Sequence, residues 1–219
     1  MSATDPARPR SGGLRATLID AALALMEETG TWRFSLREVA RRAGVSHNAH
    51  VRHFADKAAL LAAIGAAGYD ALGQDIARAV SREAGAVDGL HALVRTFVGF
   101  ALRNRPQYGL MVGKDVRAAD GSIAPDLRRA ADGARHVLKD LLDRGARAGV
   151  FTIDPDDADD LSAAVVAVWS MLHGYTLLEL ERLRQLETLI GTDELTERVS
   201  ARLVNGLVAA RPAQVTGPS

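Results

Sequence analysis

The chain has no cysteine among its 219 residues, and only 5% of its residues are aromatic. The lack of cysteine excludes a disulfide framework, thiolate zinc sites and cysteine nucleophiles, and it fits a reducing compartment. The sequence also lacks a glycine-rich phosphate loop, a nucleophile elbow and a His-Glu pair at metal-binding spacing. We therefore expect no enzyme activity, no catalytic residue, no cofactor and no metal; an all-helical enzyme using Tyr108, His136 or His173 is the alternative.

A net charge is lacking too, because 27 Lys and Arg residues balance 27 Asp and Glu residues. The balance is uneven along the chain: residues 1–60 hold nine basic against six acidic residues, so this segment carries +3 and the remainder −3. A basic contact segment on an acidic body is the charge distribution expected of a nucleic-acid-binding protein.

Long hydrophobic runs are scarce, and only residues 161–178 approach the length of a membrane-spanning helix without a charge. This stretch contains polar residues such as Ser162, Ser170 and His173, and it follows a segment rich in aspartate. We therefore expect a helix buried within protein and no membrane partner. The N-terminal residues have no apolar stretch suited to a signal peptide, so a cytoplasmic protein is expected.

Apolar residues recur at helical spacing along the whole chain, whereas β-branched residues are sparse and do not alternate with polar ones. Gly30 and Gly149 are predicted to end two helices, and Asp154 with Pro155 to begin the longest. The predicted domains are a flexible arm at 1–13, a three-helix head with a helix-turn-helix at 14–80, a larger helical body at 81–210 and a flexible tail at 211–219. The predicted fold is all-α, with about nine helices at residues 14–29, 37–43, 46–53, 57–80, 89–104, 106–113, 126–148, 154–184 and 194–209.

Two of these helices are short and joined by a tight turn at Gly44, which is the form of a helix-turn-helix. Ser35 and Glu38 have the spacing of a capping box, in which the glutamate reaches back to the Ser35 N–H. The second helix, residues 46–53, is predicted to enter the major groove with its N-terminal side chains leading. The predicted DNA-contacting residues are Ser35, Arg37, Ser46, His47, Asn48, Arg52, His53 and Lys57.

The basic and histidine residues of the head also have plainer interpretations. Arg37, Arg41 and Arg42 fit a solvated face, and a phosphate contact by one of them is the alternative. The three histidines within residues 47–53 fall at i, i+3 and i+6, an arc too wide for three ligands on one ion. A metal site is therefore not expected there.

The run LREVARRAGVSHNAHVRHFADKAALLAAI resembles the TetR family signature: a capped helix, an Ala-Gly-Val-Ser turn, a recognition helix, then His-Phe-x-x-Lys-x-x-Leu-Leu. The resemblance covers residues 14–69 and implies a DNA-binding transcriptional regulator, by family analogy a repressor. This chain has His50-Val51 where similar members have Pro-Tyr or Leu-Tyr, whose tyrosine commonly touches a phosphate. We hypothesise that DNA affinity is lower than is typical of the family, or that His50 makes a contact of its own.

The predicted long helix carries the run AVVAVWSMLHGYTLLEL, which is apolar on more than one side. Such a helix must be covered on both faces, and the same helix of a second subunit is the expected cover. A two-fold homodimer places two recognition helices about 34 Å apart, so a palindromic operator in double-stranded DNA is expected. The predicted dimer-interface residues are Met171, Leu177, Leu178, Leu203 and Leu207.

The same helix resembles a TetR subgroup named for a Trp-His-Gly (WHG) pattern, here Trp169, His173 and Gly174, and the run RNRPQYGLMVG is similar to that subgroup's sixth helix. The resemblance implies a small apolar or aromatic effector that binds in the body and releases DNA. An alternative function is a helical dimeric adaptor or effector-binding protein with weak or lost DNA binding. The predicted effector-binding residues, for each of which core packing is the alternative, are Phe97, Phe100, Tyr108, Met111, Leu138, Trp169 and His173.

Overall fold

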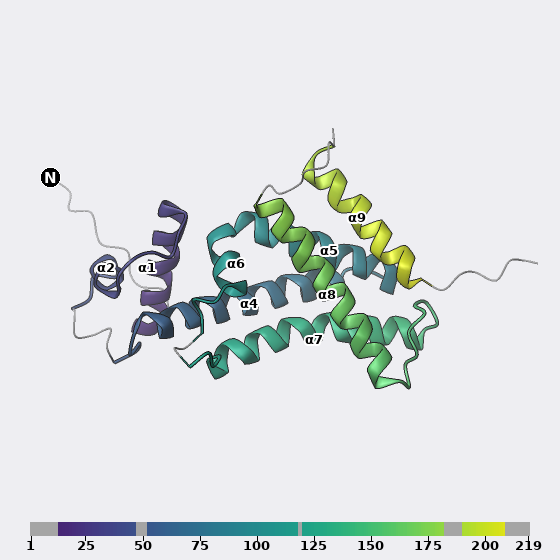
Figure 1. Cartoon of the computed structure of the whole chain (residues 1–219), viewed down its shortest axis with the longest axis horizontal. Helices are drawn as coiled ribbons and strands as arrows, with labels where there is room; N and C mark the ends of the chain where they lie inside the picture. The colour runs from purple at the N-terminus through teal and green to yellow at the C-terminus, as the bar shows by residue number, and fades with distance from the viewer. Residues whose placement is uncertain (1–12, 47–51, 118–119, 182–189, 209–219) are drawn as a thin grey trace, which may run out of the picture. The chain divides into compact units, whose positions relative to one another are not determined.

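The computed structural model describes residues 13–46, 52–117, 120–181 and 190–208, and these residues form eight α-helices and no strand (Figure 1). The helix predicted for residues 46–53 falls largely outside the described residues, so the helix after α2 is α4. The all-helical prediction is confirmed. The helices are α1 (Leu14–Thr29), α2 (Leu36–Arg42), α4 (Lys57–Val80), α5 (Ala86–Arg103), α6 (Arg105–Val112), α7 (Pro125–Arg147), α8 (Ala158–Leu180) and α9 (Thr192–Leu207).

α1 ends at the predicted glycine, and α2 begins after the predicted Ser35 cap. Gly30 adopts a left-handed conformation, with φ 69°, and its N–H donates to the Met26 carbonyl at 2.9 Å, which closes α1. Gly44, with φ 68°, makes the turn after α2. The apolar face of α1 packs against α2, and the buried residues of this region are Leu18, Ala22, Leu25, Met26, Phe34, Val39, Ala40 and Phe54.

The start of α8 corrects the sequence prediction. The capping residue is Asp157, whose carboxylate accepts from the N–H groups two and three residues on, and not Asp154. Asp154 instead makes a local turn: its Oδ1 accepts from the N–H two residues on at 2.9 Å, and its own N–H donates to Asp160 Oδ2 at 2.8 Å. These bonds compete with helix formation, so Asp154 and Pro155 precede the helix. α8 also ends at Leu180, earlier than predicted.

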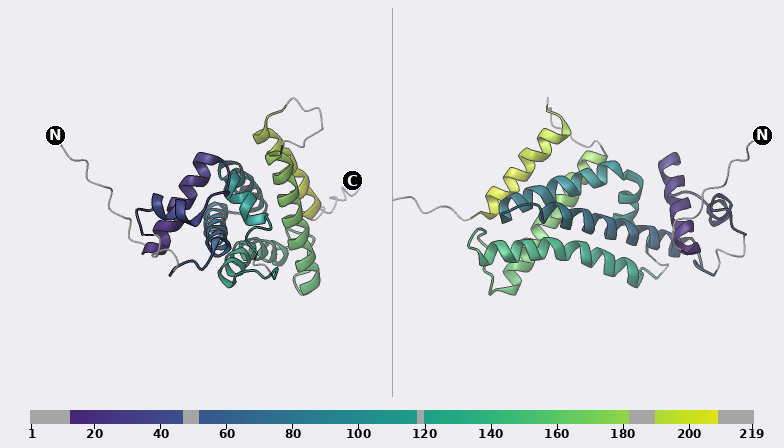
Figure 2. Two further views of the ribbon diagram at one scale, coloured as in Figure 1. Left: turned by 60° about the vertical axis from the view of Figure 1, so that its left-hand side comes forward. Right: turned by 180° about the vertical axis from the view of Figure 1, so that it is seen from behind.

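The described helices divide into two compact units. Unit 1 holds the described residues up to Asp70 together with Asn104–Ala131, so it contains α1, α2, the first part of α4, α6 and the start of α7. Unit 2 holds Ala71–Arg103 and the described residues from Asp132 onward, and in it α5 packs against α8 and α9 (Figure 2). The predicted boundary at residue 80, between a DNA-binding head and a helical body, stays a prediction.

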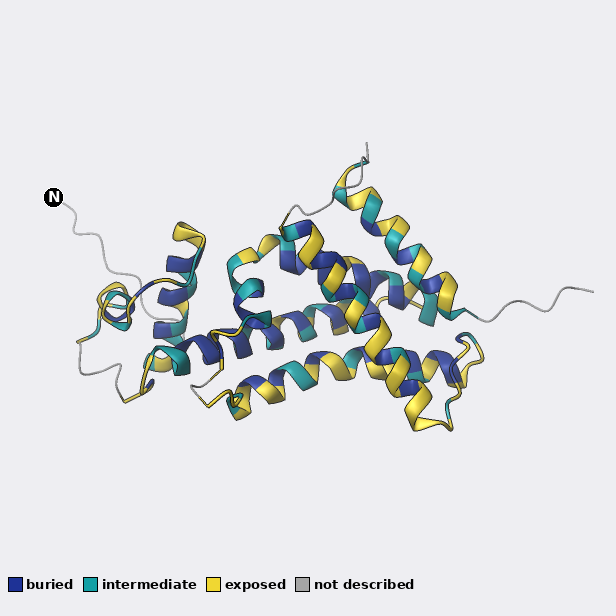
Figure 3. Ribbon diagram, in the orientation of Figure 1, coloured by how far each residue is buried: buried dark blue, intermediate teal, exposed yellow. Residues whose placement is uncertain are grey.

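Within unit 2, the described residues cover one side of α8. Leu161, Val165, Val168 and Leu172 are buried, whereas Val166, Leu177 and Leu178 are exposed. Figure 3 shows buried and exposed stretches alternating along this helix. By length and mean hydropathy, 1.5 over its most apolar window, α8 also meets the criteria for a candidate membrane span, which a core helix of a soluble protein meets as well. An apolar helix that the described residues cover on one side needs a second cover.

Candidate DNA-contact surface and effector site

The N-terminus of α2 presents a hydroxyl and backbone N–H groups at the surface. The Ser35 Oγ accepts from the Glu38 N–H at 3.1 Å, so the predicted cap forms. The reciprocal half of the predicted capping box does not form in the described residues, because Glu38 makes no hydrogen bond to the Ser35 N–H. The Glu38 carboxylate instead acts on Arg42, one helical turn along, where its charge contributes to raising the Arg42 pKa.

The three arginines of α2 have different environments that the sequence does not distinguish. Arg42 pairs with Glu28 of α1 through two hydrogen bonds, one of them from Nη1 to Oε2 at 2.7 Å. The hydrogen bond from Arg42 lowers the pKa of the Glu28 carboxyl, and the same bond raises the pKa of Arg42. Arg37 and Arg41 are exposed, and neither makes an ion pair within the described residues. The two that remain available to a ligand are therefore Arg37 and Arg41.

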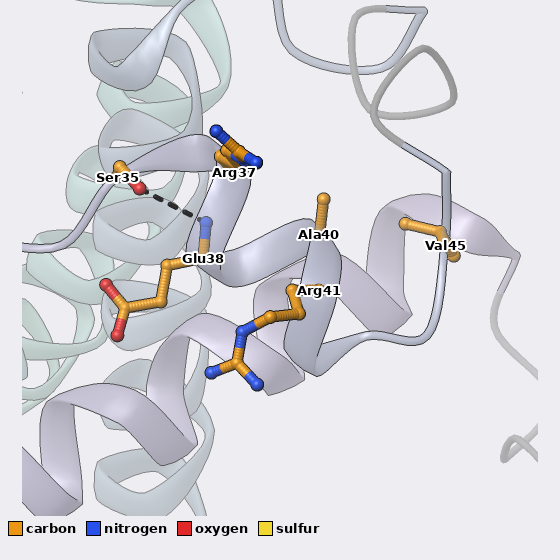
Figure 4. Close-up of a pocket in the computed structure, with 6 residues that line it drawn as sticks. All are labelled: Ser35, Arg37, Glu38, Ala40, Arg41 and Val45. Carbon is orange, nitrogen blue, oxygen red and sulfur yellow. Dashed lines mark hydrogen bonds between the residues drawn. The ribbon is translucent and has the colours of Figure 1, made fainter.

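Arg37 and Arg41 lie at a surface hollow of about 530 Å³ (Figure 4). Figure 4 shows them on α2 with the Ser35 cap at the start of the same helix. Ser35 and Arg37 lie at the start of α2 and Arg41 lies in its last turn. A hydroxyl and two guanidinium groups that make no ion pair within the described residues are suited to bind phosphate oxygens. The hollow is lined by Ser35, Arg37, Glu38, Ala40, Arg41 and Val45.

Lys57 is held close to the segment that leads into α2. The Asp56 Oδ1 accepts from the Ala59 N–H at 2.7 Å, which caps α4 and leaves Lys57 as its first residue. The Lys57 ammonium lies 5.3 Å from the ring centroid of Phe34, which directly precedes Ser35. A cation at the start of α4 is thereby fixed near the cap of α2.

The predicted recognition segment is only partly described. Ser46 is exposed, and Arg52 and His53 lie in an exposed turn before α4. His47 and Asn48, the predicted leading side chains, lie outside the described residues, as do His50 and Val51. The hypotheses about these four residues therefore stay predictions. Within the described residues there is no group of three or more His, Asp or Glu side chains suited to a metal ion.

In unit 2, Phe97, Trp169 and His173 form one aromatic cluster between α5 and α8. The ring centroids of Phe97 and Trp169 are 5.6 Å apart, those of Phe97 and His173 5.2 Å, and those of Trp169 and His173 4.9 Å. All three contacts are edge-to-face, the geometry in which aromatic rings attract most. The structure thus brings together three of the predicted effector-binding residues.

The imidazole of His173 is neutral at pH 7. Burial lowers its pKa from 6.5 to about 4, and the nearby positive charge of Arg135 adds to the effect. The Arg135 guanidinium lies 6.0 Å from the centroid of the Trp169 ring. The cluster therefore offers an uncharged wall, with its one cation at the edge.

The other predicted effector residues are buried, but not all in one unit. Phe100 and Leu138 lie in unit 2, whereas Tyr108 and Met111 belong to α6 in unit 1. There the Tyr69 hydroxyl donates to the Met111 carbonyl at 3.4 Å. Arg135 was missed from the sequence, because a charged residue on amphipathic α7 is typical of a solvated face, and Trp169, which it contacts, lies on another helix.

Of the predicted interface residues, Leu177 and Leu178 are exposed, by 39% and 46%, and the other three are half-buried. The most exposed large hydrophobic residue in the described chain, Val166 at 62%, was not among those predicted. Val166 could have been predicted from the sequence, because it lies within the run of the long helix that is apolar on more than one side.

Two sequence-family profiles match the chain. The profile described as "Bacterial regulatory proteins, tetR family" matches residues 18–64. The profile described as "Tetracyclin repressor-like, C-terminal domain" matches residues 90–203. No curated protein matches the sequence.

Solved structures share the fold over nearly the whole chain. A protein of unknown function from Rhodococcus sp. RHA1 is 28% identical, with a TM-score of 0.77 over 93% of this chain and 100% of that one. A regulatory protein in the tetR family from Rhodococcus RHA1 is 21% identical, with a TM-score of 0.64 over 92% and 100% of the two chains. The transcriptional regulator FadR from Bacillus subtilis, solved in complex with stearoyl-CoA, is 16% identical, with a TM-score of 0.64 over 87% and 98%.

Proposed function

Because the chain belongs to the TetR family of bacterial regulators, we propose that it is a cytoplasmic repressor that binds a palindromic operator as a homodimer and releases it when a small effector binds. The observation that carries the DNA-binding part is the division of the α2 arginines. Arg42 is held by Glu28, while Arg37, near the Ser35 cap, and Arg41, in the last turn of α2, stay exposed and make no ion pair within the described residues. With Ser35 at the same hollow, these two cations supply groups that can hold phosphates.

In this proposal, α2 and the start of α4 hold the phosphate backbone and the segment after Gly44 reads base edges. Ser35, Arg37, Arg41 and Lys57 supply hydroxyl and cationic groups to phosphates, which fix the position of the head on the duplex. The segment that contains His47 and Asn48 then enters the major groove. Affinity is therefore expected to fall steeply with salt.

The homodimer is supported by the exposed apolar side of α8. The side chains of Leu177 and Leu178 are exposed to water in the single chain, and a two-fold axis through this part of the helix covers them with the same helix of a second subunit. This arrangement presents two heads to one duplex. It also accounts for the hydropathy of α8 without a membrane.

The effector is proposed to be small and mainly apolar or aromatic. The edge-to-face cluster of Phe97, Trp169 and His173, with a neutral imidazole, suits an apolar body and one hydrogen bond. The Trp-His-Gly pattern supports assignment to the WHG subgroup. The Bacillus subtilis FadR structure holds stearoyl-CoA, which shows that a related fold takes a ligand with a long apolar chain.

The DNA-binding part is tested by selecting duplexes from a random-sequence pool with the purified full chain, then measuring affinity by fluorescence anisotropy at several salt concentrations. We expect an enriched inverted repeat. Arg37→Gln and Arg41→Gln should each weaken binding and reduce the slope of log affinity against log salt by about 0.9. Arg82→Gln, an exposed arginine after α4, is the matched control and should change neither.

Arg42→Gln separates a phosphate contact from a structural role on the same helix. Loss of the Arg42–Glu28 pair should lower the stability of the head, measured by thermal unfolding. The slope of log DNA affinity against log salt should be unchanged for the protein that stays folded. If no duplex is enriched, or if binding is insensitive to salt, the proposal fails and the helical adaptor becomes the better interpretation.

A further inference from the structure

A second hollow lies in unit 2, between α7 and α8, and differs in character from the aromatic cluster. It has a volume of about 250 Å³, roughly that of eight water molecules in the liquid. One wall is basic and comes from α7; the other, from α8, is largely apolar. Its lining residues are Arg135, His136, Lys139, Ser162, Val165 and Val166.

The basic wall has one cation that no carboxylate balances within the described residues. Arg135 Nη1 pairs with Asp132 Oδ1 at 3.0 Å, which leaves other N–H donors of its planar fork unused by that contact. Lys139, one helical turn further along, is exposed and makes no ion pair in the described part of the chain. A ligand with a negative group would find two cations on the same face of α7.

The remaining polar groups of the hollow are occupied locally. The His136 Nδ1 lies 2.8 Å from the Asp132 carbonyl, and because a carbonyl only accepts, Nδ1 carries the proton and Nε2 is left for another partner. The Ser162 hydroxyl donates to the Ala158 carbonyl at 2.7 Å. The charge that selects a ligand is therefore that of Arg135 and Lys139.

We propose that this hollow binds the carboxylate of a small amphipathic acid, with Arg135 and Lys139 holding the charge and Val165 and Val166 contacting the apolar body. Arginine donors match a carboxylate in two parallel hydrogen bonds, and aliphatic side chains opposite them favour a hydrocarbon over a polar ligand. The volume suits an acid of on the order of ten non-hydrogen atoms. The inference rests on the proposed role of unit 2 as an effector domain.

Arg135 connects this hollow to the aromatic cluster. The same guanidinium lies over the Trp169 ring, which contacts Phe97 and His173. A carboxylate that draws Arg135 toward Lys139 changes this stacking, so occupancy of the hollow is transmitted to the cluster and alters the emission of Trp169. The acid is thus recognised by charge at the edge of a site whose interior is uncharged.

The test is isothermal titration calorimetry on the DNA-free full chain with sodium octanoate, octan-1-ol and octanoyl-CoA. Octanoate should bind at least tenfold more tightly than octan-1-ol, which has the same chain without the charge. Equal affinity for octanoate and octan-1-ol would overturn the proposal. Binding of octanoyl-CoA without binding of octanoate would assign recognition to phosphates and would overturn it too.

Variants locate the site. Arg135→Gln and Lys139→Gln should each weaken octanoate binding about five- to tenfold and leave octan-1-ol binding unchanged. Ser162→Phe should fill the hollow and abolish octanoate binding, with circular dichroism confirming the fold. Arg144→Gln, an exposed arginine of α7 outside the hollow, is the control and should bind as the wild type does.

The ligand site and the repressor function can be disproved separately. If octanoate binds as described but no duplex is selected from the random pool, the hollow is a ligand site and the proposed repressor function is wrong. If the protein selects a duplex but Lys139→Gln binds octanoate with wild-type affinity, the regulator stands and the assignment of this hollow is overturned.

Discussion

His173 makes the stability of unit 2 depend on pH. Its pKa is lowered to about 4, first by burial and then by the charge of Arg135. Between that pH and 6.5 the unfolded chain takes up a proton that the folded protein does not. Stability from this group is therefore complete above pH 6.5 and is lost as the pH falls below it.

We expect His173→Gln to reduce this pH dependence. Between pH 7 and pH 5 the wild type should lose about 2 kcal/mol more of its unfolding free energy than the variant, as measured by urea denaturation. Arg135→Gln should give a smaller reduction, because it removes only the secondary cause. Equal losses in the wild type and His173→Gln would show that the imidazole is not buried as described.

At the scale of single residues, sequence reasoning identified types of residue but not their partners. Phe97, Trp169 and His173 were among the seven predicted effector-binding residues, but the sequence did not separate them from Tyr108 and Met111, which lie in unit 1. The arginines of α2 were not separable, because the residue that holds Arg42 lies 14 positions earlier on another helix. Local spacing contains no information about such a contact.

Helix ends were predictable where one residue decides them and not where several compete. Gly30 ends α1 and Ser35 caps α2, as the sequence predicts. Before α8, Asp154, Asp156 and Asp157 lie within four residues, and each can accept a backbone N–H. Which of them caps the helix depends on how the turn folds, and local spacing does not determine this. The sequence predicted Asp154 as the cap, whereas the cap in the structure is Asp157.

The packing at the end of α7 depends on a glycine. A Cβ at Gly145 would lie 2.2 Å from ring carbons of Phe151 and 3.1 Å from the Ala86 Cβ. Phe151 is buried, its N–H donates to the Gly145 carbonyl at 3.3 Å, and the next residue's N–H donates to the Leu207 carbonyl at 2.7 Å. The ring therefore has little freedom to move aside.

Two substitutions on α7 isolate this close approach. Gly145→Ala should destabilise the protein by about 1–3 kcal/mol, because overpacking outweighs the gain in helix propensity. Gly133→Ala, where an added Cβ meets nothing within 4 Å, should stabilise it by about 0.5–1 kcal/mol. Urea denaturation of both variants is the measurement, and a stabilising Gly145→Ala would contradict the packing described.

For the whole molecule, the sequence carried the charge asymmetry and the apolar excess of the long helix, but neither reveals how many copies assemble. Zero net charge alone argues against DNA, and among the charge features only the division at residue 60 points toward it. In the described chain the exposed side of α8 is the feature that a single copy leaves unexplained. It is therefore the place to test the assembly.

Leu178→Asp should convert the protein to a monomer. In a two-fold interface along α8 the new carboxylate is buried twice, once from each subunit, and an unpaired buried charge costs several kcal/mol. Light scattering coupled to size-exclusion chromatography should show one chain mass for the variant and twice that mass for the wild type. Far-ultraviolet circular dichroism should be unchanged, because Leu178 is 46% exposed in the single chain.

The monomer should also lose most of its affinity for the selected inverted repeat, by about 100-fold or more, since one head contacts one half-site. Gln74→Asp, which adds the same charge at an exposed position of α4, is the control and should remain dimeric with unchanged DNA affinity. A Leu178→Asp protein that is still dimeric at micromolar concentration would show that the subunits pair through another surface. The exposed residues of α8 would then need a different cover.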